Sequence, residues 1–275
     1  MRSIPSAVFG PVLSPPCRRQ RPFAIAGHLH GVPRRFFAPH RSAVTGNLQV
    51  GASELSSVLN PIVTNAEYTA RKLTGAVELN LRPVYEQHGL YRVQFAPGSP
   101  QLTDAGVSVT VAITEGAPYQ LGKVDLEGED LPVPVMLAAA KFPNGKLANW
   151  KQIQDGIWEA EKVVKRTGFF EASGAPTRSY DDTAHVLDLH VRITKGPHYH
   201  FGEVRFVGLS SDLQERARRI WKAKPGDNYD YEYPNEFFRE FSRTVDFRNF
   251  RKFEARTHSG AGDHVMDISL VFEPK

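Results

Sequence analysis

Ten histidines and several acidic clusters are the side chains of this sequence most able to do chemistry. His198 and His200 stand out, because alternate imidazoles on one face of a strand can bind a metal ion. They have a single carboxylate nearby, Glu203, whereas a closed metal site requires four ligands. A second copy of this segment, described below, carries proline and glutamine in their places. We therefore predict that these histidines are surface or hydrogen-bonded residues and that no metal is bound.

The familiar catalytic motifs do not occur in the sequence. It contains no Gly-x-Ser-x-Gly, no phosphate-binding loop and no His-Glu-x-x-His. The acidic residues at 181–182 and 127–130 fall where turns are expected, and acids are common in turns. The single cysteine, Cys17, excludes a disulfide within the chain or a thiolate metal site. The sequence predicts a protein that is not an enzyme and that uses no cofactor.

A segment that occurs twice, at residues 113–128 and 193–208, organises the chain. Ile, Thr, Gly, Tyr, Gly, Val and Gly match in the two copies without a gap, at a spacing of 80 residues. Each copy follows a stretch in which apolar and polar residues alternate, which is the signature of a half-buried strand. The same alternation returns at residues 266–272. The sequence therefore predicts three repeated units.

The order of elements is clearest in the second unit. It has an apolar strand pattern at 119–126, helical patterns at 133–140 and from Trp150 to Gly168, and strand patterns near 170 and at 186–193. We predict an α+β fold of three tandem β-α-α-β-β repeats, residues 45–116, 117–196 and 197–275. Each repeat should be a three-stranded mixed sheet covered on one face by two helices. Six glycines, spread over the three repeats, should hold the turns: Gly89 and Gly168 as helix caps, and Gly116, Gly128, Gly196 and Gly208 next to strands.

Residues 1–44 form a predicted disordered arm. The first 53 residues contain seven arginines and no acidic residue, so the net charge of +4 arises here and the rest of the chain is slightly acidic. Its many prolines and arginines give a composition that cannot bury enough surface to order it. The arm is similar in composition to an organellar transit peptide or to a mistranslated upstream reading frame, and it lacks the apolar core of a secretory signal. Few aromatic residues accompany the charge, so nucleic-acid binding is not predicted.

Residues 45–275 resemble tandem polypeptide-transport-associated (POTRA) domains of the outer-membrane β-barrel assembly and surface antigen family. The resemblance is carried by the paired Ile-Thr-x-Gly-x-x-Tyr-x-x-Gly-x-Val segments and by two helix-to-strand corners, Tyr85-x-x-x-Gly-Leu-Tyr91 and Lys165-Arg-Thr-Gly-Phe-Phe170. The first unit departs from the pattern through a poor opening strand, and the third through the loss of the corner glycine. The resemblance implies a place on the periplasmic face of the bacterial outer membrane, or in an organellar outer envelope if the arm is a transit peptide.

The resemblance also implies a function in binding polypeptides. POTRA domains receive unfolded outer-membrane or secreted polypeptides by β-strand augmentation and pass them to a membrane barrel, which would be a further domain of this protein or another chain. Periplasmic accessory proteins are the other partners it implies. The receptive edge is the strand after the second helix of each unit. Its residues in this sequence are Tyr91, Val93, Phe95, Phe170, Ala172, Phe253 and Ala255.

A second interpretation stays open, in which the fold serves as a structural module that grips one fixed partner in a secretion or division complex. Division proteins of this type usually have one such domain behind a membrane helix. This sequence has three repeats and no stretch near the ~18 consecutive apolar residues that a membrane helix requires. The first interpretation is therefore favoured.

Overall fold

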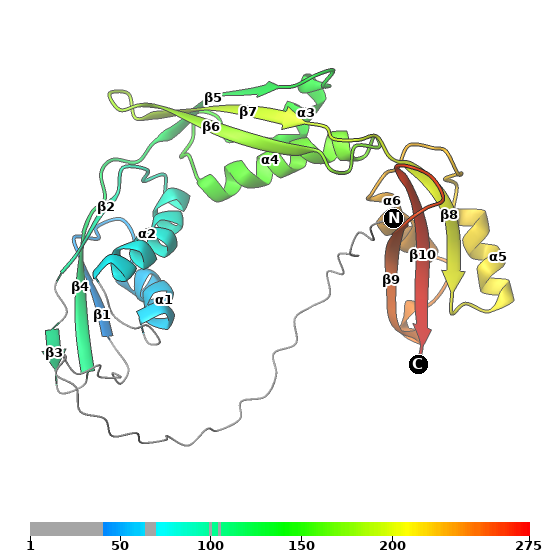
Figure 1. Cartoon of the computed structure of the whole chain (residues 1–275), viewed down its shortest axis with the longest axis horizontal. Helices are drawn as coiled ribbons and strands as arrows, with labels where there is room; N and C mark the ends of the chain where they lie inside the picture. The colour runs from blue at the N-terminus through cyan, green and yellow to red at the C-terminus, as the bar shows by residue number, and fades with distance from the viewer. Residues whose placement is uncertain (1–40, 64–69, 99–100, 104–105) are drawn as a thin grey trace, which may run out of the picture. The chain divides into compact units, whose positions relative to one another are not determined.

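The computed structural model describes residues 41–63, 70–98, 101–103 and 106–275 (Figure 1). The predicted disorder of the arm concerns residues that lie almost entirely outside this range. The described residues form three sheets, each with two helices, and the predicted class of three tandem α+β repeats is confirmed. We call the repeats units 1, 2 and 3.

The elements follow the same order in each unit. Unit 1 comprises β1 (Arg41–Thr45), α1 (Ala52–Val63), α2 (Ala70–Gln87), β2 (Gln94–Pro97), a short additional strand β3 (Gln101–Thr103) and β4 (Gly106–Thr114). Unit 2 comprises β5 (Gln120–Glu127), α3 (Val133–Ala140), α4 (Trp150–Lys165), β6 (Ser173–Asp181) and β7 (Val186–Thr194). Unit 3 comprises β8 (His200–Val207), α5 (Ser211–Ile220), α6 (Tyr233–Phe241), the 3-10 turn η1 (Phe247–Asn249), β9 (Phe250–Ser259) and β10 (Val265–Pro274).

Unit 1 begins earlier than the sequence predicted. The strand β1 pairs in parallel with β4, from Arg41 opposite Ser108 to Thr45 opposite Ala112. The predicted boundary at residue 45 is therefore corrected to include this strand. Its five residues, Arg-Ser-Ala-Val-Thr, are too few and too polar to give a recognisable alternation, so its place in the sheet is visible only in three dimensions.

The last strand of each unit lies in the centre of its sheet. The orders are β1-β4-β2, β5-β7-β6 and β8-β10-β9, with the first strand parallel to the central strand and the third antiparallel to it. The alternating residues of β7 that the sequence marked as buried, from Leu187 to Ile193, are at most 4% exposed. They pack against one face of α4 through Ile153, Ile157 and Ala160. In Figure 1, α3 and α4 cover one face of this sheet.

A bulge interrupts the first strand of units 2 and 3 at the same place. The register between β5 and β7 shifts between Leu121 and Val124, and the Lys123 N–H donates to the Asp188 carboxylate at 2.6 Å. In unit 3 the Glu203 N–H donates to Asp267 at 2.7 Å. A carboxylate on the central strand thus accepts the N–H that the bulge leaves unpaired.

A glycine ends the first strand of each unit where its backbone meets the central strand. A Cβ at Gly208 would lie 1.9 Å from the Phe272 carbonyl oxygen, and a Cβ at Gly128 would lie 2.6 Å from that of Ile193. Gly46 meets the Ile113 carbonyl in the same way, at 2.2 Å. Gly208 also has φ of +82°. Any side chain at these positions would push the first strand away from the centre of the sheet.

Gly208→Ala should destabilise unit 3 by about 3 kcal/mol, because the αL conformation and the contact with the central strand both oppose a Cβ. Gly226→Ala is the matched control in the same unit. Gly226 has φ of +91° but nothing within 4 Å of the built Cβ, so its substitution should cost about 1 kcal/mol. Urea denaturation of the two variants measures the difference. Equal losses would show that the close approach does not govern the packing of this strand.

Candidate functional site

Each sheet ends in an antiparallel strand with a hydrogen-bonded neighbour on one side only. These strands are β2, β6 and β9, the outer members of the three sheets (Figure 1). Half of the N–H and C=O groups of such a strand point away from the sheet, and they can pair with another extended chain. This row of groups is the candidate site.

The opposite edge of units 2 and 3 is bonded at its start by the loop between the two helices. In unit 2 the Leu121 N–H donates to the Lys146 carbonyl and the Gly145 N–H donates back to Leu121. In unit 3 the Phe201 N–H donates to the Asp227 carbonyl and the Gly226 N–H donates back to Phe201. The loop therefore bonds the backbone groups at the start of the first strand, and we take the antiparallel edge as the candidate.

Three of the predicted edge residues lie on these strands. Phe95 is on β2, opposite Ile113, and Phe253 and Ala255 are on β9, opposite Phe272 and Leu270. Phe253 is 44% exposed, although its ring contacts the core.

The other four predicted edge residues lie before the strands and are corrected here. Tyr91, Val93 and Ala172 are buried, and Phe170 is half-buried. The chain makes a turn after the helix before it joins the sheet, and the Ala172 N–H is used in that turn to bond the Phe169 carbonyl. The edge strand of unit 2 therefore begins at Ser173 rather than at Phe170.

The predicted helix-cap glycines join successive units. The Gly89 carbonyl accepts the Tyr119 N–H at 2.9 Å, and the Gly168 carbonyl accepts the Tyr199 N–H at 2.7 Å. Both glycines have positive φ, and a Cβ at Gly168 would lie 2.4 Å from the His198 ring. The remaining predicted turn glycines, Gly116 and Gly196, lie in the links between units and each have φ of +74°.

The aromatic residue two positions after Gly89 and after Gly168 packs in the core of the following unit. Tyr91 belongs to the core cluster of unit 2, and its hydroxyl donates to the Ala148 carbonyl at 2.7 Å. Phe170 packs against the core of unit 3, with ring centroids 4.5 Å from Tyr199 and 5.7 Å from Tyr229. These residues therefore connect successive units.

Comparison with known proteins supports this architecture. No family model matches the chain. The crystal structure of POTRA domains 3 to 5 of Haemophilus influenzae BamA is similar over 88% of this chain and 99% of that one, with 18% identity and a TM-score of 0.54. The chain has the POTRA fold.

Two further solved structures match with lower TM-scores. POTRA domains 1 to 3 of the periplasmic domain of Omp85 from Anabaena match at 16% identity, covering 86% of this chain and 95% of that one, with a TM-score of 0.34. CdiB from Escherichia coli matches at 16% identity, covering 73% of this chain and 34% of that one, with a TM-score of 0.28.

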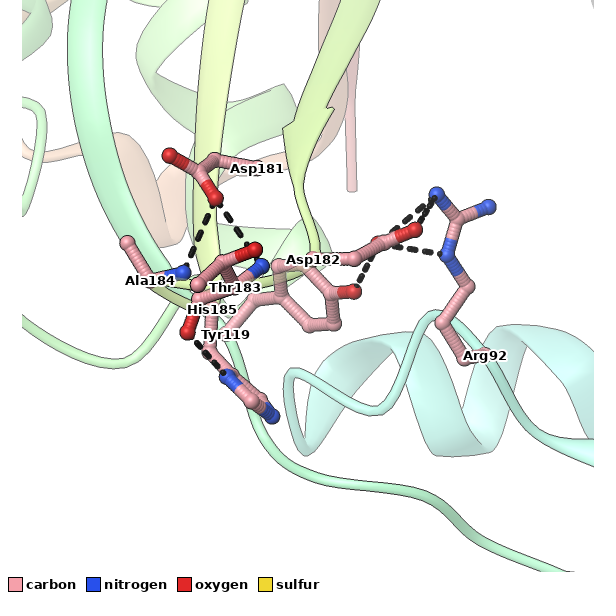
Figure 2. A network of polar contacts seen from close by, with 7 residues as sticks. All are labelled: Arg92, Tyr119, Asp181, Asp182, Thr183, Ala184 and His185. Atoms are coloured by element: carbon pink, nitrogen blue, oxygen red, sulfur yellow. Dashed lines mark hydrogen bonds and ion pairs between the residues drawn. The ribbon is translucent and has the colours of Figure 1, made fainter.

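An ionic network ties the first two POTRA-like units together (Figure 2). The Arg92 guanidinium in unit 1 donates to both oxygens of Asp182 in unit 2, at 2.9 and 3.0 Å, and the Tyr119 hydroxyl donates to the same carboxylate. The neighbouring Asp181 accepts the Thr183 and Ala184 N–H groups and so shapes the turn that presents Asp182. The two acids lie at a turn between β6 and β7, as the sequence predicted, and their bonds across the joint were not predicted.

The network perturbs the titration of its members. The Tyr119 hydroxyl, and after it the Arg92 guanidinium, hold the pKa of the Asp182 carboxyl below its usual 3.8. The pKa of Tyr119 is raised, first by burial and then by its bond to Asp182. The ionised form of Asp182 is therefore favoured while the units are joined.

Additional ion pairs differ between the two joints. Arg178 on β6 makes a bidentate pair with Glu86 on α2, at 2.8 and 3.3 Å, and its guanidinium lies 3.5 Å from the centre of the Trp150 ring. At the second joint Arg166 bonds Asp230 at 3.0 Å and Glu236 at 2.5 Å. The backbone bonds at the joints are repeated, whereas the charged contacts belong to each joint separately.

The histidine pair lies at the second joint. His198 Nε2 is 3.0 Å from the Thr167 carbonyl oxygen, and His200 Nδ1 is 3.0 Å from that of Gly226. No group of three or more His, Cys, Asp or Glu in the described part of the chain could hold a metal ion. Within the same residues, no helix is both long and apolar enough to cross a membrane.

The sequence prediction did not include the carboxylates that accept the N–H groups of the two bulges. Asp188 and Asp267 are 79 residues apart on alternating strands, and this spacing was the signal that could have revealed their shared role. The function of Tyr91 and Phe170 was also missed, because an aromatic residue after a corner glycine suits an edge strand and a joint equally well.

Asp182→Asn should weaken the joint at neutral pH and should flatten the acid dependence of stability. Since the folded pKa of Asp182 is depressed, its contribution is present above pH 3.8 and is lost as the pH falls through the lower, folded value. Urea denaturation at pH 7 and at pH 3 tests this, with Asp130→Asn as a control of the same charge change in another turn. If the control and Asp182→Asn showed the same pH dependence, the joint would not depend on this carboxylate.

Proposed function

We propose that the chain is a polypeptide-binding scaffold of an outer-membrane protein assembly or translocation machine. In this proposal it holds extended segments of unfolded outer-membrane or secreted polypeptides by β-strand augmentation and passes them to a membrane barrel. It acts on the periplasmic face of the outer membrane, where POTRA domains stand. Periplasmic accessory proteins are further partners.

The observation that carries the proposal is the edge strand of each unit. It follows two helices, pairs with the central strand on one side and has backbone groups directed away from the sheet on the other. Main-chain hydrogen bonds provide affinity without demanding a particular sequence, which suits a protein that must accept many unfolded clients. The contacts are weak individually, because ordering the client offsets much of the gain.

The comparisons and the polar groups favour this proposal over an enzymatic function. The fold match is to the POTRA region of BamA, and the organellar alternative gains no support from it. The most prominent charged residues, Arg92, Asp182, Arg178 and Glu86, bond one another across the joint. They are thereby engaged in holding units together.

A titration with a generic extended peptide tests the proposal. An eight- to ten-residue peptide with alternating apolar residues should shift the backbone amides of an edge strand in a 15N-labelled sample, and a version with prolines at every second position should not. Shifts confined to helix surfaces, or none with any extended peptide, would favour the module that grips one fixed partner.

A further inference from the structure

The three edge strands can be aligned through the central strand. Pro97 of β2 lies opposite Val111, Pro176 of β6 lies opposite Val191, and Ala255 of β9 lies opposite Leu270. The three central residues are spaced by 80 and 79 positions, as the repeat requires. Units 1 and 2 therefore have proline at the position where unit 3 has alanine.

The prolines stand in the row of residues whose N–H would point outward. In unit 1 the Gly98 N–H donates inward to the Thr110 carbonyl, so its neighbour Pro97 faces the other way. In unit 2 the Gly174 N–H, two residues before Pro176, donates to the Glu161 side chain at 2.8 Å and not to the central strand. Each proline thus removes one outward donor from its edge.

In units 1 and 2 a side chain from the second helix also forms a hydrogen bond with an outward backbone group at or next to the edge strand. Glu161, which is 9% exposed and pairs with Lys165 at 3.3 Å, accepts the Gly174 N–H. Arg82 donates to the Val93 carbonyl at 3.2 Å, just before β2. Arg82 and Glu161 occupy matching positions in the second helices of units 1 and 2. Arg82 directly follows the buried Leu81, and Glu161 directly follows the buried Ala160.

Unit 3 has neither the edge proline nor the bond from a side chain of the second helix to an outward backbone group. The residue after the buried Phe241 is Ser242, where α6 has already ended, and its hydroxyl donates to the Arg239 carbonyl. Within the described residues, no side chain accepts the N–H of Phe253 or Ala255, the two residues that match Gly174 and Pro176. The strand β9 is ten residues long and contains no proline or glycine.

We propose that β9 is the edge at which an extended polypeptide adds to this protein, while β2 and β6 are closed to it. This inference rests on the proposed function and assigns it to one strand. It also accounts for the lost corner glycine of unit 3, since η1 leads directly into a longer strand.

The two faces of β9 specify the chemistry of the added strand. On the helix side Phe253 is 44% exposed, and its ring lies 4.6 Å from that of Phe247, so an apolar side chain of the partner can pack beside it. On the other side Lys252 and Arg256 share one carboxylate, Glu254. A partner segment that alternates apolar and acidic residues matches both faces.

The test uses the full chain and a capped ten-residue peptide of alternating valine and glutamate. We expect amide shifts and slowed hydrogen exchange at Phe253, Ala255 and Thr257. The variant Ala255→Pro places in unit 3 the residue that units 1 and 2 carry, and it should weaken binding at least tenfold while the circular dichroism spectrum is unchanged. Pro176→Ala is the matched control and should leave the affinity unchanged. A peptide with lysine in place of glutamate should bind at least threefold more weakly.

The outcomes separate this inference from the function on which it rests. Peptide-induced shifts on β2 or β6 would overturn the assignment to β9 and leave strand addition intact. Shifts at no edge strand would overturn both. Protection of the same β9 amides without peptide, rising with protein concentration, would assign the edge to a second copy of this chain and contradict the proposal. If Ala255→Pro does not fold, the exchange pattern of the unsubstituted chain decides between these results.

Discussion

Each unit depends on a central strand that is bonded on both sides. This strand is the last one in sequence, and it holds the first strand in parallel and the third in antiparallel pairing. Its alternating side chains form the floor of the core, and the glycine at the end of the first strand packs against its carbonyl groups. Because the central strand comes last, no unit can complete its sheet until the whole repeat is present. Both flanking strands are then edges, and the units differ in which groups bond or block each edge.

The edge formed by the first strand has the same backbone bonds in units 2 and 3. The loop between the helices bonds the first strand, through the Gly145 and Lys146 segment in unit 2 and the matching residues of unit 3. The antiparallel edge is treated differently in each unit. An unpaired edge invites association with other chains, and natural proteins close such edges with proline or with charged side chains. Pro97 and Pro176 are examples of the first method, and Glu161 is a buried example of the second.

The joints between units use the aromatic residues that follow the corner glycines. Tyr91 and Phe170 each leave their own unit and pack in the next, and the glycine carbonyl beside each accepts a backbone N–H from that unit. The corner of unit 3 has no such role within the described residues, because Phe250 packs against Phe247 and Phe272 of its own unit. The three corners therefore occupy the same place in the repeat, but the aromatic residue packs against the next unit in units 1 and 2 and within its own unit in unit 3.

The sequence by itself determined the repeat, the class of fold, the order of elements and the glycines at the corners. These features depend on local periodicity and on backbone conformations that one residue type favours, so they can be read along the chain. The tertiary structure decided where β1 begins, which residues accept the N–H groups of the bulges, and that Tyr91 and Ala172 are buried rather than at an edge. It also decided which edges are closed, since Glu161 and Gly174 are on different elements and Pro176 shows its role only once the register with Val191 is known. These features depend on which side chains and backbone groups of distant segments meet, and no single stretch of the sequence states its partner, so they appear only when the chain is folded.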